Sequence, residues 1–108
     1  MARLPGPFMR LKQDYPKVAD AYERFGEACF DAGPLDRKTA ELVKLACAMG
    51  AGSEGAVHSH TRRALQAGAK PDELRHAAIL GFTTIGFPNG MAGLTWVEDV
   101  LKEKRSRR

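Results

Sequence analysis

Apolar residues recur at steps of three and four along most of the chain, and this spacing predicts a series of amphipathic helices. The first predicted helix covers residues 14–32, with Asp14 as its cap and with Gly33 and Pro34 ending it. Its apolar stripe consists of Tyr15, Val18, Ala19, Tyr22, Phe25, Cys29 and Phe30. Because Cys29 belongs to this stripe, we expect it to be a small buried hydrophobic residue.

Four further helices follow, each bounded by turn or capping residues. They are predicted over residues 36–50, 53–67, 72–86 and 91–104. Asp36 and Ser53 cap the first two of these, and Gly68 gives a left-handed stop to the helix that Ser53 opens. The helix over residues 72–86 is apolar nearly all round, so we expect part of its cover to come from another subunit. The predicted fold class is all-α, a bundle of about five helices.

The predicted domain organisation is a single helical domain over residues 14–104, flanked by two short segments. Residues 1–13, which contain two prolines, are expected to be an extended N-terminal arm, and residues 105–108 are a basic tail. Several apolar side chains are expected to contact a neighbouring subunit: Leu4, Phe8, Leu11, Trp96 and Val100.

The formal net charge of +4 is typical of some nucleic-acid-binding proteins, so the position of the charges matters. Residues 102–108 hold five cations and one anion, whereas the other 101 residues hold 12 cations and 12 anions. We interpret the excess as a solvated helix end that complements the helix dipole. The longest mostly apolar stretch, residues 77–87, is too short to span a bilayer. We therefore expect neither a nucleic-acid partner nor a membrane partner.

The chain has two cysteines, Cys29 and Cys47, without a Cys-x-x-Cys spacing. Cys47, like Cys29, is expected to be a core residue. Residues 1–8 contain two prolines and no apolar run, so we expect no secretory segment there. These observations favour a reducing cytoplasm as the compartment of the protein.

The candidate chemistry follows a Gly-Ala-Gly break that separates two helices. Each residue of a helix advances by about 100°, so Ser53, Ala56 and His60 fall within about 40° of one another. His60 has apolar neighbours on this face and is expected to point inward. His58 and Arg62 lie about a quadrant or more away, so the two histidines are not expected to share a ligand.

Each candidate also has a purely structural interpretation. Ser53 and Glu54 are well suited to cap a helix and to place an acid in its first turn. Glu41 could pair with a neighbouring cation at the surface, an interaction that contributes little. His60 could be a core histidine with satisfied hydrogen bonds, and the two arginines that follow it could be solvated helix residues.

Four segments together resemble one known superfamily. They are Leu-Asp-Arg-Lys-Thr at residues 35–39, Gly-Ser-Glu-Gly-Ala-Val-His-Ser-His-Thr-Arg-Arg-Ala-Leu at 52–65, Ala-Gly-Ala-Lys-Pro-Asp-Glu-Leu at 67–74 and Gly-Phe-Pro at 86–88. Their order and spacing resemble the carboxymuconolactone decarboxylase and alkyl hydroperoxidase D-like superfamily over roughly residues 15–101. The resemblance implies an all-helical fold and assembly into trimers or hexamers.

The peroxidase branch of this superfamily carries a glutamate, a Cys-x-x-Cys pair and a histidine four residues after the second cysteine. Glu41 and His60 match the glutamate and the histidine, but Ser53 and Ala56 stand at the cysteine positions. Peroxide reduction by that route needs a low-pKa thiolate and a resolving thiol. Cys47 lies across a glycine break and is a poor substitute, so the resemblance does not extend to this activity.

The decarboxylase branch is closer, because it lacks the cysteines and has a Glu-Gly pair six residues before a histidine, as in Glu54, Gly55 and His60. It implies a lyase without cofactor or metal that acts on a small lactone or carboxylic acid. His60 would donate the proton, and Glu41 would orient its ring. The other residues that the resemblance implies are Glu54 as a further catalytic residue and Ser53, His58, Arg62 and Arg63 as substrate contacts.

Two alternatives stay open. One is a thiol peroxidase, which Ser53 and Ala56 disfavour, and the other is a non-catalytic oligomer that keeps the pocket for binding or assembly. Blocking the cysteines tests the first alternative, and His60→Ala separates the second from an enzyme. The expected partners are a small-molecule substrate and further copies of the chain, whereas the identity of the substrate depends on pocket shape.

Overall fold

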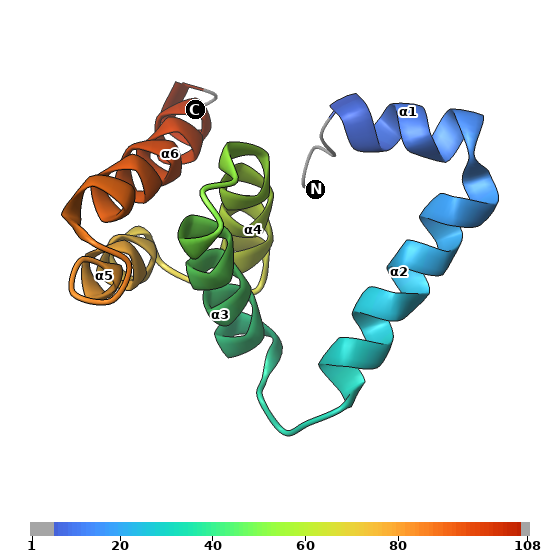
Figure 1. Cartoon of the computed structure of the whole chain (residues 1–108), viewed down its shortest axis with the longest axis horizontal. Helices are drawn as coiled ribbons and strands as arrows, with labels where there is room; N and C mark the ends of the chain where they lie inside the picture. Colours follow the sequence, from blue (N-terminus) through green and yellow to red (C-terminus); the bar gives the residue numbers. More distant parts are fainter. Residues whose placement is uncertain (1–5, 107–108) are drawn as a thin grey trace.

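The computed structural model describes residues 6–106, and every regular element in that range is a helix (Figure 1). The order along the chain is α1 (Gly6–Asp14), α2 (Pro16–Asp31), α3 (Arg37–Gly50), α4 (Glu54–Gln66), α5 (Pro71–Gly81) and α6 (Phe87–Ser106). The predicted all-α class is therefore confirmed, with one helix more at the N-terminal side than the sequence pattern predicts.

Helices α3 to α6 pack around one apolar core. Its largest fully buried apolar side chains are Leu45, Met49, Val57, Leu74 and Val97, which come from all four helices. Burying a side chain of this kind contributes about 1.5–3 kcal/mol to folding. This core holds α3 against α4, the two helices that carry the residues of greatest chemical interest.

Helices α1 and α2 meet at a corner and form a bent pair, called here the α1–α2 hairpin, that stands beside this bundle (Figure 1). Phe8 on α1 contacts Tyr22 on α2, with ring centroids 6.1 Å apart. Ala19 is the one buried residue of α2, all of which the structure describes. The apolar stripe of α2 is otherwise uncovered, and Val18 and Phe25 are 55% and 66% exposed. The hairpin therefore contributes little to the core of its own chain.

The extended arm predicted over residues 1–13 is wrong for the part that the structure describes, because that part is helix α1. Pro7 lies in the first turn of α1, where its missing N–H breaks no hydrogen bond. Asp14 ends α1 and so cannot cap α2, whose cap position is Tyr15 without a side-chain hydrogen bond. Leu4, an expected contact residue, lies outside the described residues.

The caps predicted for α3 and α4 are confirmed. Asp36 Oδ1 accepts a hydrogen bond from the backbone N–H of Thr39 at 2.8 Å, and Ser53 Oγ accepts one from Ala56 at 3.3 Å. Each bond satisfies one of the N–H groups that the start of a helix leaves unpaired. After α4, Gly68 adopts the predicted left-handed conformation with φ of +99°.

Three expectations about exposure need correction. Cys29 and Cys47 are exposed free thiols rather than core residues. Cys47 is two positions before the buried Met49, so it points to the other side of α3. Val100 is buried within the chain and is not available for a subunit contact, and Trp96 packs partly against the same core.

Two helix boundaries also differ from the prediction. Helix α5 ends at Gly81, five residues early, and α6 begins at Phe87, four residues early. Pro88 falls in the first turn of α6, a position that tolerates proline. Among the described helices, none combines the length and the apolar character that crossing a membrane requires.

Candidate functional site

The candidate site begins with a contact between α3 and α4. His60 Nδ1 on α4 lies 2.9 Å from Glu41 Oε1 on α3. Glu41 is 3% exposed and the side chain of His60 is 21% exposed. The carboxylate is therefore enclosed in the bundle while the imidazole still reaches its surface. With Nδ1–H donating to Glu41, the ring is held by one nitrogen and Nε2 is left for another partner.

Local sequence explains why these two side chains meet. Glu41 lies four residues before the fully buried Leu45, so it shares the face of α3 that packs against α4. On α4, the Ser53 cap fixes the start of the helix. His60 then falls one turn after Ala56 on the same side. Helix periodicity and a cap are thus sufficient to direct both side chains toward the contact.

Opposing effects set the pKa of Glu41. Burial is the largest single influence and raises this pKa, because the carboxylate loses hydration in the bundle. The hydrogen bond and the charge of His60 lower it, and the charges of Lys44 and Arg63 lower it further. Together the lowering effects prevail, so the pKa of Glu41 lies below its ordinary value of 4.5. Glu41 is therefore ionised at neutral pH.

His60 opens onto a cavity of about 580 Å³ between the α1–α2 hairpin and the α3–α4 pair. The lining residues are Phe8, Lys12, Tyr22, Glu23, Gly26, Glu27, Arg37, Lys44, Gly55, Ala56, Ser59, His60 and Arg63. Lys12 and Arg37 are engaged by Glu23 and Glu27 at 3.6 and 3.4 Å. The volume is in the range of small-ligand sites.

Two other cations of the cavity wall, Lys44 and Arg63, differ from Lys12 and Arg37 in their ion pairing. Among the described residues, neither Lys44 nor Arg63 takes part in an ion pair within 4 Å. Both nevertheless act on the charge of Glu41. Together with His60, Lys44 and Arg63 make the cavity wall suitable for binding an anion or for stabilising a developing negative charge.

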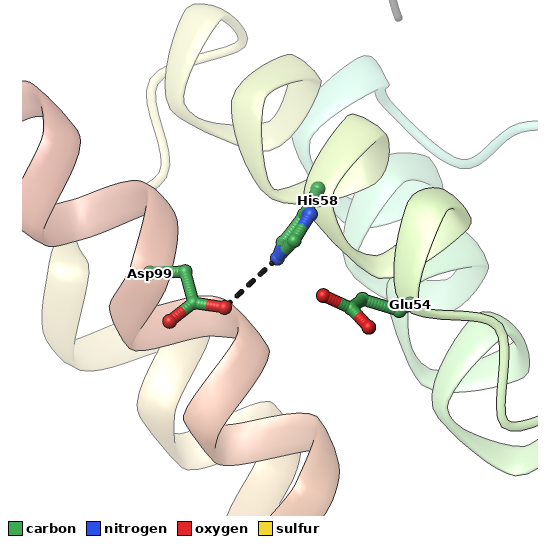
Figure 2. Close-up of side chains that lie close together, drawn as sticks. All are labelled: Glu54, His58 and Asp99. Atoms are coloured by element: carbon green, nitrogen blue, oxygen red, sulfur yellow. Dashed lines mark hydrogen bonds and ion pairs between the residues drawn. The ribbon is translucent and has the colours of Figure 1, made fainter. Parts of the chain in front are cut away.

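The structure separates the residues that the sequence pattern proposes for the site. His60, Glu41 and Arg63 come together at the cavity. Glu54 and His58 lie on the side of α4 that faces α6, where His58 Nε2 is 3.1 Å from Asp99 Oδ2 (Figure 2). A further set is placed away from the cavity lining: Ser53 caps α4, and Arg62 pairs with Glu103 on α6 at 3.1 Å.

Sequence reasoning missed Lys44, Ser59 and the contribution of α1 and α2 to the cavity. Lys44 could have been found, because it lies three residues after Glu41 and such positions are neighbours on a helix. Ser59 precedes His60 directly and carries no pattern that distinguishes it. The hairpin residues could not have been found, because local periodicity does not say where a separate hairpin docks.

Comparisons with known proteins agree with this architecture. An uncharacterized protein of Haemophilus influenzae is 37% identical over 57 residues, which are 53% of this chain and 50% of that protein. The chain therefore matches about half the length of this relative. A crystal structure of a Burkholderia xenovorans LB400 protein, provisionally named a carboxymuconolactone decarboxylase, superposes with a TM-score of 0.70. The two chains are 26% identical, and the superposition covers 97% of this chain and 85% of the other.

The sequence pattern that defines the Carboxymuconolactone decarboxylase family matches residues 16–99. This range includes α2 to α5, most of α6 and the contact between His60 and Glu41. Since the match extends over well more than half of the sequence, the chain belongs to the carboxymuconolactone decarboxylase family.

Proposed function

We propose that this protein is a cofactor-free decarboxylase-type lyase that acts on a small lactone or carboxylic acid, with His60 as the proton donor. The observation that carries the proposal is the hydrogen bond of 2.9 Å between His60 and the buried Glu41 at the wall of a cavity. Family membership supports the same class of reaction.

The proposed reaction replaces a carboxyl group of the substrate by a proton, which the protein delivers. The bond between the carboxyl carbon and the ring carbon breaks, carbon dioxide leaves, and the electron pair delocalises into the ring carbonyl as an enolate. A proton from the imidazolium then reaches the carbanionic carbon and restores a neutral product. Glu41 holds the ring through Nδ1, so that Nε2 is the nitrogen that donates.

Lys44 and Arg63 have the charge to act on the substrate. A cation that held the departing carboxylate tightly would favour the ground state, because that charge disappears as carbon dioxide forms. A cation at the carbonyl oxygen favours the transition state, because negative charge develops there. We therefore place one of the two at the carbonyl oxygen and the other at any second carboxylate of the substrate.

Self-association is part of the proposal. The exposed apolar stripe of α2 and the exposed Leu80 of α5 support assembly of further copies around the bundle. A trimer or a hexamer is the expected form. Peroxide reduction is not favoured, because neither cysteine is among the described residues that line the cavity beside His60.

The test compares the purified protein with its His60→Ala variant for release of carbon dioxide from a carboxylated unsaturated lactone. We expect kcat to fall by about 10²–10⁴-fold, the usual contribution of a general acid, while the oligomer stays intact in light scattering. His76→Ala on α5 is the matched control and should keep the wild-type rate. An unchanged rate in His60→Ala would assign proton donation to another group, and a wild-type protein without turnover would favour a binding role.

A further inference from the structure

Glu54, His58 and Asp99 form a cluster on the side of α4 that faces α6 (Figure 2). One potential ligand atom from each residue lies within 4.8 Å of the other two, and His58 Nε2 is 3.1 Å from Asp99 Oδ2. Glu54 and His58 are four positions apart on α4, so their side chains project from the same side of successive turns. Figure 2 shows the carboxylate of Glu54 directed toward the other two side chains.

We propose that Glu54, His58 and Asp99 bind one divalent transition-metal ion, which joins α4 to α6. An imidazole nitrogen with two carboxylate oxygens is a donor set that suits Zn²⁺ and its neighbours in the first transition row. Three protein ligands leave at least one coordination position for water. The sequence pattern predicts no metal, because Asp99 lies 41 residues from His58 and only the fold brings it near.

The distances require little rearrangement. Zn²⁺ bonds of about 2.0–2.2 Å in a tetrahedral site place two ligand atoms roughly 3.3 Å apart. The contact between His58 and Asp99, at 3.1 Å, already has this spacing. Glu54 is exposed, so its carboxylate can approach by a change of side-chain rotamer. The exposed side chains of Glu54 and Asp99 also give the ion a path from solvent.

The charge of the cluster itself favours a cation. With a neutral imidazole, the two carboxylates give the cluster a charge of about −2, which one divalent ion balances. The nearest cation along α4 is Arg62, which pairs with Glu103 at 3.1 Å. On α6, the carboxylate before Asp99 is Glu98, which is engaged by Arg75 at 2.7 Å. Arg62 and Arg75 thus pair with carboxylates outside the cluster.

This site is separate from the one that carries the proposed reaction. His58 and His60 are two positions apart on α4, about 200° around the helix. His60 contacts Glu41 on α3, whereas His58 contacts Asp99 on α6. A metal at the cluster therefore clamps α4 to α6 and leaves the hydrogen bond of His60 in place. Metal binding at the cluster does not depend on the proposed lyase activity and can be measured directly.

The test is a titration of the chelator-treated full chain with ZnCl₂ by calorimetry, with CoCl₂ in parallel to follow the visible absorption of the bound ion. We expect one ion per chain and a tetrahedral or five-coordinate Co²⁺ spectrum. At Zn²⁺ about 100-fold above its Kd, the melting temperature should rise by about 5 °C or more. His58→Ala and Asp99→Asn should each weaken binding by at least about tenfold.

Two controls make the assignment specific. His76→Ala removes a histidine outside the cluster, and a Cys29→Ser, Cys47→Ser double variant removes the exposed thiols; both should bind Zn²⁺ as the wild type does. Asp99→Asn keeps the shape of the side chain, so a folding defect in His58→Ala would not hide the result. The absence of binding to the wild type would overturn the proposal. Binding that survives His58→Ala, or is lost with the cysteines, would overturn it as well.

Discussion

Glu41 is a carboxylate that the fold encloses almost completely, with 3% of its surface exposed. An isolated ionised carboxylate in such a position would be strongly unfavourable. His60 compensates by a hydrogen bond, and Lys44 and Arg63 contribute positive charge. Because His60 and Arg63 belong to α4, this compensation exists only when α3 and α4 are packed together. The pair that carries the proposed chemistry is therefore also a link between pH and folding.

Replacing Glu41 by glutamine should make the free energy of unfolding less dependent on pH in the acidic range. The folded state holds the pKa of Glu41 below 4.5, so the unfolded chain binds this proton at a higher pH. The stabilisation is fully present above that value and is lost as pH falls through the lowered pKa. Urea unfolding at a series of pH values should show a steeper loss for the wild type than for Glu41→Gln. Parallel curves for the two proteins would contradict this assignment.

Arg62 and Arg63 are adjacent in sequence but have different surroundings. Arg62 points toward α6 and pairs with Glu103, whereas Arg63 lines the cavity with His60. The resemblance implied both as substrate contacts, although helix geometry already placed Arg62 about a quadrant or more away from the face of His60. The docking of α6 on one side of α4 made the distinction.

At the scale of elements, α4 presents two clusters of polar side chains on opposite sides. His60 and Arg63 lie toward α3 and the cavity, and Glu54, His58 and Arg62 lie toward α6. Val57 and Ala64 are fully buried between them. Helix α4 is therefore held by α3 on one side and by α6 on the other, with its apolar strip in the core between them.

Helix α6 approaches the rest of the bundle closely because two of its positions are glycine. A Cβ atom at Gly93 would lie 2.8 Å from Met49 Cγ, and one at Gly90 would overlap the ring of Phe82. Met49 is itself 1% exposed, so it has little room to move. Gly93 thus sets the distance between α6 and α3, and Gly90 sets the distance between α6 and the end of α5.

Gly93→Ala should therefore destabilise the protein by up to about 2 kcal/mol. The clash with Met49 costs about 1–3 kcal/mol, and the better helix propensity of alanine returns up to about 1 kcal/mol of it. Gly26→Ala on α2 is the matched control, because a Cβ there meets nothing within 4 Å. We expect that variant to be neutral or more stable in urea unfolding. Equal stabilisation of both variants would mean that α6 is not packed this closely.

At the scale of the molecule, the uncovered surface of α2 is the main feature that one chain leaves unexplained. Tyr15, Val18, Tyr22 and Phe25 are all more than half exposed, although they follow the spacing of a core-facing stripe. The same hairpin closes one side of the cavity through Phe8, Lys12 and Tyr22. Contacts between copies of the chain would therefore hold the hairpin and shape the cavity at the same time.

Phe25→Glu should weaken the proposed oligomer. An unpaired carboxylate buried at an interface is unfavourable by several kcal/mol, so we expect the dissociation constant to rise by about 100-fold or more. Arg24→Gln is the control, because Arg24 lies on another side of α2 and pairs with Asp20 near the solvent. Light scattering over a range of protein concentrations gives the dissociation constant of each variant. A Phe25→Glu protein that keeps the wild-type mass would exclude this face as the interface.

The sequence by itself determined the class of the fold, most of the helices and the pair at the centre of the site. Periodicity identified α2 to α6, the side chains of Asp36 and Ser53 fixed two helix starts, and Glu41 and His60 were found from their match to a known pattern. The helices and their caps follow from interactions within a few residues or from the angle between positions on one helix. The pair of Glu41 and His60, which joins two helices, came instead from the resemblance to a known family. The helices and caps need no information about how distant segments pack.

The tertiary structure decided which surfaces meet. It turned the N-terminal segment into α1, left the cysteines exposed and buried Val100. It also brought Asp99 to His58 and placed the α1–α2 hairpin across the cavity from His60. The physical reason is that an apolar stripe on a helix indicates which side is buried, but not which partner covers that side. Only the packing of whole helices supplies that second piece of information.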